Sequence, residues 1–150
     1  MRVFKDLAEL SASVGEELGV SEWHEVTQEQ VNQFAEATGD HQWIHVDPEK
    51  AAQGPFGRTI AHGYLTVSLI PMLSAETYKV ESVKMGVNYG SEKVRFPAPL
   101  PVGSRVRGRA TLVEVVPVAL GQRVAVDFTL EVEGGDKPVC VARTLAIFAE

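Results

Sequence analysis

The sequence has a single cysteine, Cys140, so no disulfide can form within one chain. A reducing compartment suits such a chain, and we expect the protein in the cytoplasm. Long apolar runs are also absent. The longest, Tyr64 to Leu73, is interrupted by Ser68 and Pro71 and is too short to span a bilayer. No apolar run follows the basic residues near the N-terminus, so we expect neither a signal peptide nor a membrane partner.

Basic residues are outnumbered, with 14 Lys and Arg against 20 Asp and Glu and a net charge of −6. This balance argues against general nucleic-acid binding, which needs clustered positive charge. No GxGxxG or GxxxxGK[ST] loop is present, which disfavours dinucleotide redox chemistry and nucleotide hydrolysis. No repeat or linker divides the 150 residues, so we expect one domain over 1–150.

The first half of the chain predicts helices. A weak pattern indicates a helix over 5–18, and an extended piece follows at 22–26. Thr27 has Gln30 three residues later, a capping-box spacing, and apolar residues at helical spacing predict a helix over 28–38. Gly39 follows at the position of a helix-ending glycine. Asp47-Pro48 then predicts a second, short helix, with the aspartate as its cap.

The second half predicts strands around one buried helix. Residues 63–78 form a helix that is apolar nearly all round, and Pro71 should kink it. After residue 80 the hydrophobic period becomes two, which predicts strands at 83–89, 105–112, 123–133 and 138–148, with a turn at Gly134-Gly135. This is an α+β layout, and its simplest packing wraps an antiparallel sheet around the helix.

Titratable side chains gather between residues 38 and 63, where three of the four histidines lie: His41, His45 and His62. Asp40 and His45 follow a helix end, so a bent loop could join them as an acid/base pair. In the alternative interpretation, Asp40 only caps a turn and His45 is a half-buried structural histidine.

Gly63 opens the apolar helix. A helix start has free N–H groups and the positive end of the helix dipole, so this N–H could hold a developing oxyanion. In the alternative interpretation the glycine is small only for packing. Oxygen and nitrogen ligands for a metal are also nearby, in Asp40, His41, His45, Asp47 and His62. Gly39 and Pro48 interrupt any continuous helix that could present them, so we expect no metal site.

Two further features have simpler explanations. Cys140 lies in an apolar strand and should be an inert buried thiol. Arg105, Arg107 and Arg109 alternate along one strand and should form a solvated face, with phosphate contact as the alternative.

Three motifs in order resemble one family. They are 34–40 (Phe-Ala-Glu-Ala-Thr-Gly-Asp) with His45 and 47–52, then 60–65 (Ile-Ala-His-Gly-Tyr-Leu), then 94–103. Together they resemble the MaoC-like dehydratases, also called (R)-specific enoyl-CoA hydratases or hydratase 2. The sequence of residues 39–48 is similar to that of the NodN-like branch, and the resemblance to the family extends from about residue 20 to the end.

The resemblance implies a hot-dog fold, a long central helix wrapped by an antiparallel sheet, and a homodimer with the acyl chain near that helix. Asp40 and His45 match the catalytic pair of the family. The oxyanion or substrate-binding group is expected to comprise Gly63, Gln42, Trp43 and His62. Gln42-Trp43 replaces the usual Asn-Pro, so Gln42 would support the loop with a longer reach and Trp43 would shape the acyl pocket.

The activity implied is a lyase reaction, the interconversion of trans-2-enoyl and (R)-3-hydroxyacyl thioesters. Coenzyme A or an acyl carrier protein would carry the acyl group, and no metal or redox cofactor is needed. Two alternatives remain, a hot-dog acyl-CoA thioesterase and a non-catalytic binder of acyl thioesters. The Asp40-to-His45 spacing favours hydration over hydrolysis.

Overall fold

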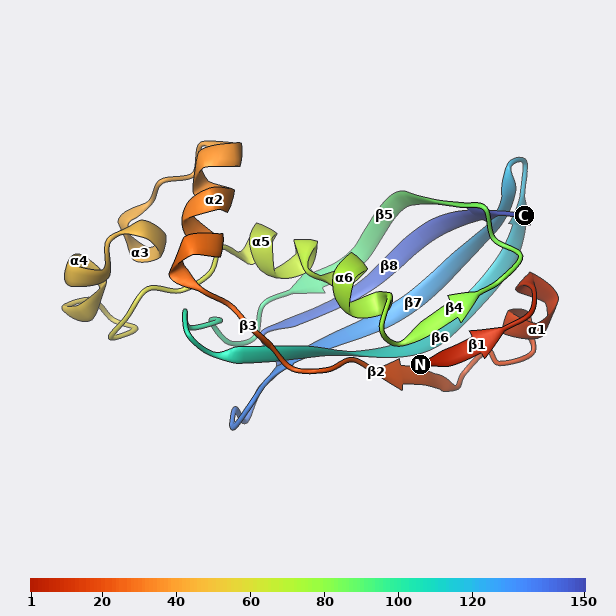
Figure 1. The fold of residues 1–150 in the computed structure, drawn as a ribbon, viewed down its shortest axis with the longest axis horizontal. Coiled ribbons are helices and arrows are strands. Elements are labelled where there is room, and N and C mark those ends of the chain that lie inside the picture. Colours follow the sequence, from red (N-terminus) through yellow and green to blue (C-terminus); the bar gives the residue numbers. More distant parts are fainter.

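The alternating residues after position 80 form the long strands that the sequence predicts. The computed structural model describes residues 1–150, and its main element is a six-stranded sheet with the path β2-β6-β7-β8-β5, in which β3 also pairs with β6 (Figure 1). All pairings in this sheet are antiparallel. Its strands are β2 (Glu17–Val20), β3 (His24–Glu25), β5 (Met85–Arg95), β6 (Arg105–Val118), β7 (Gly121–Val132) and β8 (Cys140–Ala149).

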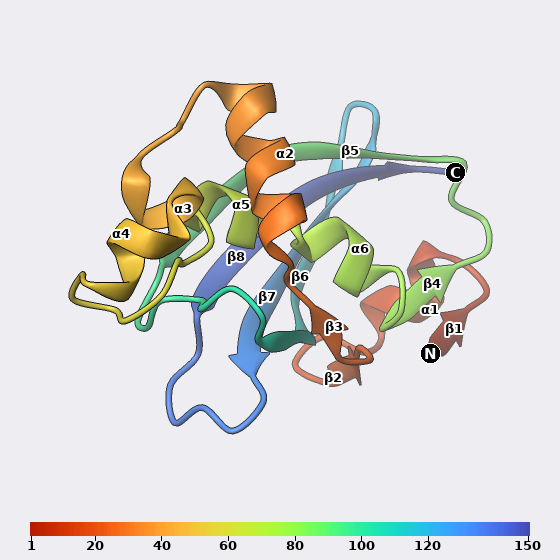
Figure 2. The ribbon, with the colours of Figure 1, turned by 60° about the vertical axis from the view of Figure 1, so that its left-hand side comes forward.

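A short helical segment lies across the concave face of the sheet, as Figures 1 and 2 show. It consists of α5 (Gly63–Ser68) and α6 (Ile70–Ser74), separated at Leu69. The sheet therefore wraps around a central helix, and the predicted hot-dog fold is confirmed.

The prediction of one long, wholly buried helix over 63–78 is wrong. The interruption lies just before Pro71, which has no N–H to bond the carbonyl four residues earlier. The helical segment ends at Ser74, and the chain enters β4 (Tyr78–Val80). One face of the helix is open in the single chain, because Tyr64 is 80% exposed and Met72 is 42% exposed.

The predicted helix over 5–18 is also too long. The structure has α1 (Leu7–Ser11), after which Gly15 takes a left-handed φ of 91° and the chain enters β2. The short strand β1 (Arg2–Phe4) precedes α1 and pairs in parallel with β4, forming a two-stranded sheet that the sequence pattern did not indicate.

Between β3 and α5 the chain forms α2 (Gln28–Thr38), α3 (Trp43–Val46) and α4 (Pro48–Ala52). The predicted ends of α2 are confirmed: Thr27 accepts a hydrogen bond from the Gln30 N–H, and Gly39 has a left-handed φ of 84°. Asp47 caps α4 as predicted, accepting from the Lys50 N–H at 3.0 Å. None of the helices in the structure is long and apolar enough to cross a bilayer.

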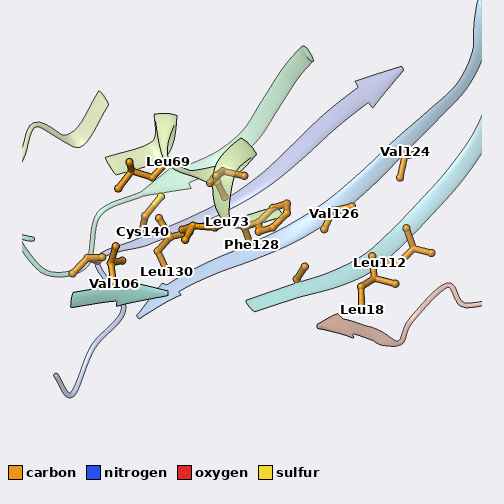
Figure 3. Packing of buried hydrophobic residues seen from close by; sticks show 14 of the residues in the cluster. Leu18, Leu69, Leu73, Val106, Leu112, Val124, Val126, Phe128, Leu130 and Cys140 are labelled. Carbon is orange, nitrogen blue, oxygen red and sulfur yellow. The ribbon is translucent and has the colours of Figure 1, made fainter. Parts of the chain in front are cut away.

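The core lies between α6 and the inner face of the sheet (Figure 3). Leu73 packs so closely on β6 that a Cβ at Gly108 would lie 3.1 Å from the Leu73 side chain. Cys140 is fully buried in this core, and burial raises the pKa of its thiol to about 11, as expected for an inert cysteine. The remaining labelled core residues are Leu18, Leu69, Val106, Leu112, Val124, Val126, Phe128 and Leu130.

The arginines of β6 are occupied by ion pairs. Arg105 pairs with Glu133, and both Arg107 and Arg109 pair with Glu131. Arg107 also lies over the ring of Trp23. These partners confirm the solvated strand face and leave the phosphate-contact alternative without support.

The three motif segments meet beside α5. The Ile60 N–H donates to the Ile44 carbonyl at 3.0 Å, and the Ala61 N–H donates to the Leu100 carbonyl at 2.8 Å. The Val102 N–H donates to the Thr59 carbonyl at 2.9 Å. These bonds join residues 16 to 43 positions apart in sequence and fix the three segments around one helix start.

Candidate active site

Asp40, His45 and His62 converge at the start of α5. Each offers an oxygen or nitrogen atom, and these atoms all lie within 4.8 Å of one another. The two histidine rings are stacked, with centroids 4.0 Å apart and an angle of 24° between planes. The structure therefore brings together the predicted pair, Asp40 and His45, and adds His62 directly against it.

His45 lies in α3 and is only 6% exposed. Its Nδ1 is 2.7 Å from the Ile60 carbonyl oxygen, which can only accept, so Nδ1 carries the proton and Nε2 keeps a lone pair. Burial lowers the pKa of His45 below its ordinary value of 6.5, against the opposing effect of the bond to Ile60. At neutral pH this residue is a base with a free Nε2.

Asp40 lies in the exposed loop between α2 and α3. Its carboxylate accepts from the Gln42 N–H at 3.3 Å, and its backbone carbonyl accepts from Nε2 of His62 at 3.0 Å. The loop bends sharply after Gly39, which brings Asp40 toward His45 as the sequence indicated.

Gly63 is the first residue of α5, and no side chain caps this helix start. Its N–H is one of the groups that a helix leaves without an internal acceptor. A packing reason for the glycine is present as well, because a Cβ here would lie 3.0 Å from the ring of Phe96. The two interpretations of Gly63 are thus compatible.

The other predicted site residues lie farther from the cluster. The Gln42 side chain makes no hydrogen bond to the loop, and only its backbone does so, accepting from the His45 N–H. The Trp43 ring packs against Gly54, and Lys50 lies over its face at 4.8 Å. These contacts agree with Trp43 packing under the loop.

Two of the five metal-ligand candidates do not join the cluster. His41 is exposed and lies 3.6 Å from Glu36, and Asp47 caps α4. Of the remaining three, His45 and His62 have stacked rings. Because imidazole lone pairs lie in the ring plane, stacked rings do not aim them at one point, as tetrahedral ligands of a metal must.

Sequence reasoning missed Gln28 and Thr59, which hold the base in place. Nε2 of Gln28 donates to the His45 carbonyl at 2.7 Å, and the Thr59 hydroxyl donates to Oε1 of Gln28 at 2.5 Å. This chain of bonds links α2, α3 and the strand-like segment before α5. Nothing in the sequence marks a glutamine in the first turn of a helix for this task.

A cavity of about 520 Å³ lies between the central helix and the sheet. It begins at Val67 and Ser68, about 6 Å along α5 from Gly63 at 1.5 Å per residue. Most of its lining is apolar, and it extends past Ile70 and Pro71 to Ser74 and Tyr78. Strands β5, β7 and β8 form the opposite wall.

Comparison with known proteins agrees with this geometry. The model of a MaoC like domain matches residues 9–137. The chain is similar to 3-hydroxyacyl-thioester dehydratase Z of Mycobacterium tuberculosis, with 56% identity over 97% of each chain. It is also similar to nodulation protein N of Rhizobium leguminosarum, with 44% identity over 94% of this chain and 89% of that protein.

Among solved structures, the fold is similar to an R-hydratase from Pseudomonas aeruginosa in the unliganded form. The TM-score is 0.77 at 23% identity, covering 97% of this chain and 86% of that chain. An (R)-hydratase from A. caviae gives a TM-score of 0.73 at 22% identity, covering 89% and 95%. These likenesses establish the hot-dog arrangement.

Proposed function

Because this chain belongs to the family of MaoC-like domains, we propose that it interconverts trans-2-enoyl and (R)-3-hydroxyacyl thioesters by reversible hydration. One observation carries the proposal: a neutral, buried His45 with a free Nε2 lies beside Asp40 at an uncapped helix start. General acid/base chemistry on a polarised thioester needs these groups and no others, so we expect no metal or redox cofactor.

The proposed reaction begins with a water held between Asp40 and His45. His45 accepts a proton on Nε2 as the water oxygen bonds to the β-carbon, and the π electrons of the double bond move toward the thioester carbonyl. The α-carbon then takes a proton from the same pair, which restores the enzyme. General acid/base catalysis of this kind contributes about a hundredfold to ten-thousandfold in rate.

Gly63 stabilises the negative charge that these electrons place on the thioester oxygen. Its N–H stabilises the enolate-like oxygen that develops on the thioester, an effect worth about 3 kcal/mol for one well-placed donor. The lack of a capping side chain at His62 supports this role, because no internal acceptor competes for the N–H.

The acyl group enters on a coenzyme A or carrier-protein thioester, and its chain occupies the cavity along α5 and α6. The cavity supports this placement because it begins one helical turn from Gly63 and is lined largely by apolar side chains. Related proteins also carry names that specify thioester substrates.

Two copies of the chain pair through β5 in this proposal. This strand bonds only β8, so its other edge is free over eleven residues. Exposed long edges invite pairing, and Val87 (45% exposed) and Tyr89 (62% exposed) make this one apolar. Sedimentation of the parental protein and of Tyr89→Glu tests this pairing, with a monomeric variant expected.

Incubation with crotonyl-CoA tests the activity. The absorbance of the enoyl thioester should fall without release of free thiol, and this loss should require Asp40 and His45. Thiol release would instead identify a thioesterase. Binding of the thioester without either change would identify a non-catalytic binder.

A further inference from the structure

The proposed chemistry uses Asp40, His45 and Gly63, and it leaves the side chain of His62 without a task. His62 is nevertheless in contact with each of them. It donates from Nε2 to the Asp40 carbonyl at 3.0 Å, it stacks on the His45 ring at 4.0 Å, and it immediately precedes Gly63. At 2% exposure, its own ring is out of reach of a substrate.

The bond to Asp40 joins two otherwise separate parts of the site. The Asp40 carboxylate bonds Gln42 within the same loop, which does not fix the loop against α5. His62 provides that link from the N-cap position of α5. In the reverse direction, His45 bonds the Ile60 carbonyl just before α5. The two stacked rings therefore fasten each segment to the backbone of the other.

The two ring nitrogens of His62 have different surroundings. Its Nε2 holds the proton that is donated to Asp40, and its Nδ1 is buried with no hydrogen-bond partner. The Phe34 ring packs against His62 at a tilt of 52°, with its centroid 4.9 Å away.

We infer that His62 is a positioning residue, which holds the Asp40 loop, the His45 ring and the Gly63 helix start in one arrangement through its Nε2 donor and its stacked ring. The unpartnered Nδ1 is consistent with this role. An orphaned buried nitrogen destabilises the fold, and the chain carries it where a phenylalanine would pack without that penalty. This assignment rests on the hydratase activity proposed above.

The decisive variant is His62→Phe, which keeps a stacked ring but removes the donor to Asp40. We expect its melting temperature to equal or exceed that of the parental protein, because the orphaned Nδ1 is gone. Its kcat for crotonyl-CoA should fall by at least about tenfold, because small misplacements of catalytic groups are costly. KM and the binding of unreactive butyryl-CoA should change by less than about twofold, since the mispositioned groups act in the transition state.

His62→Gln supplies the rescue, because a glutamine amide can place an N–H near the position of Nε2. Its kcat should exceed that of His62→Phe by at least about threefold, although glutamine packs less well. Stability and activity then follow opposite orders across the two variants, which a purely structural role would not produce. If His62→Phe does not fold, His62→Met, which also lacks the donor, takes its place.

Thr66→Val is the matched control. Thr66 is also 2% exposed and donates to the His62 carbonyl at 2.8 Å, but no hydrogen bond joins it to Asp40 or His45. This variant should lose stability and keep its kcat. A kcat of His62→Phe within twofold of the parental value, or activity that falls only in step with stability in both variants, would overturn the assignment. A parental protein without hydration activity would instead overturn the proposed function.

Discussion

The central strands and the helical segment 28–62 are stabilised in different ways. In β6, β7 and β8, ladders of backbone hydrogen bonds surround fully buried side chains such as Val106, Leu112 and Leu130. Between residues 28 and 62 three of the eight buried residues are polar: the eight are Val31, Ala35, His45, Ala51, Thr59, Ile60, Ala61 and His62. Side-chain bonds to backbone carbonyls fasten this segment instead.

The difference separates stability from chemistry. Apolar burial in the sheet contributes most of the free energy of folding, since each large buried side chain is worth about 1.5–3 kcal/mol. The side-chain hydrogen bonds of the helical segment contribute only about 1 kcal/mol each, but they fix the positions of Asp40 and His45. Substitutions should therefore reduce folding stability in one region and turnover in the other.

The largest effect should come from the catalytic pair. Asp40→Asn and His45→Gln should each lower kcat for crotonyl-CoA by at least about a hundredfold, because acid/base transfer is lost. Both variants should stay folded, as judged by melting temperature, because Asp40 is exposed and His45 lies outside the apolar core. Near-normal rates in either variant would refute the assignment of the catalytic pair. Unfolding of either variant would show that the helical segment also determines folding stability.

The pH dependence of kcat/KM gives a second test of His45. Its lowered pKa means that the base is neutral at pH 7 and becomes protonated only below the ordinary histidine value of 6.5. We therefore expect a flat profile near neutrality and an acid limb below 6.5. Because the unfolded chain binds this proton more readily than the folded chain, the free energy of unfolding should decrease as the pH is lowered below 6.5. An acid limb above 6.5 would contradict this environment.

The sheet should respond in the opposite way. Leu130→Ala, at a fully buried position, should lower the free energy of unfolding by about 2–5 kcal/mol through lost burial and a cavity. The kcat of the remaining folded protein should stay within about twofold, since Leu130 lies in β7 between Gly108 and Cys140, neither of which belongs to the site. Denaturant unfolding with activity normalised to folded protein measures both. Loss of kcat beyond the folded fraction would show that the sheet positions the site directly.

The same contrast explains what could be predicted from the sequence. Alternation along residues 105–112 and 123–133 predicted β6 and β7, because strand periodicity records burial on one face. Thr27, Gly39 and Asp47 predicted helix ends from local cap geometry. The family motifs then indicated Asp40 and His45, and the structure places these two side chains together.

The contacts that cross between segments could not be predicted. The bonds of Gln28 to His45 and to Thr59 and the bond from His62 to Asp40 join residues 17 to 31 positions apart, and no local pattern encodes them. The prediction of a wholly buried central helix was wrong for a related reason. Its apolar residues on all sides indicated complete burial, but Tyr64 and Met72 are exposed in the single chain.

A smaller effect should follow at Gly63. A Cβ on this residue would lie 3.0 Å from the Phe96 ring, so either the ring or the helix start must move. Gly63→Ala should lower kcat by about thirtyfold, within the effect of losing one oxyanion donor. Adding Phe96→Ala should recover part of the lost kcat, because removing the Phe96 ring makes room for the new methyl group. An equal defect with and without Phe96→Ala would show that the methyl group itself, and not the displaced helix start, blocks the reaction.

The smallest effect should come from Trp43, which lies between Asp40 and His45 in sequence. Its ring contacts Gly54 and Lys50 and does not line the cavity along the central helix. Because Trp43 is only half-buried, Trp43→Ala should cost about 1–2 kcal/mol, less than the roughly 3–5 kcal/mol of a fully buried aromatic.

A packing role also predicts that Trp43→Ala leaves the ratio of kcat/KM for trans-2-octenoyl-CoA to that for crotonyl-CoA unchanged, because all substrates lose the same support. Lys50→Met is the matched control: it removes the cation over the ring, which contributes about 0.5–1 kcal/mol, and keeps the chain of methylenes. A shift of the ratio toward the longer substrate with an unchanged melting temperature would instead identify Trp43 as a wall of the acyl pocket. In that case the segment that carries Asp40 and His45 would also contribute to substrate choice.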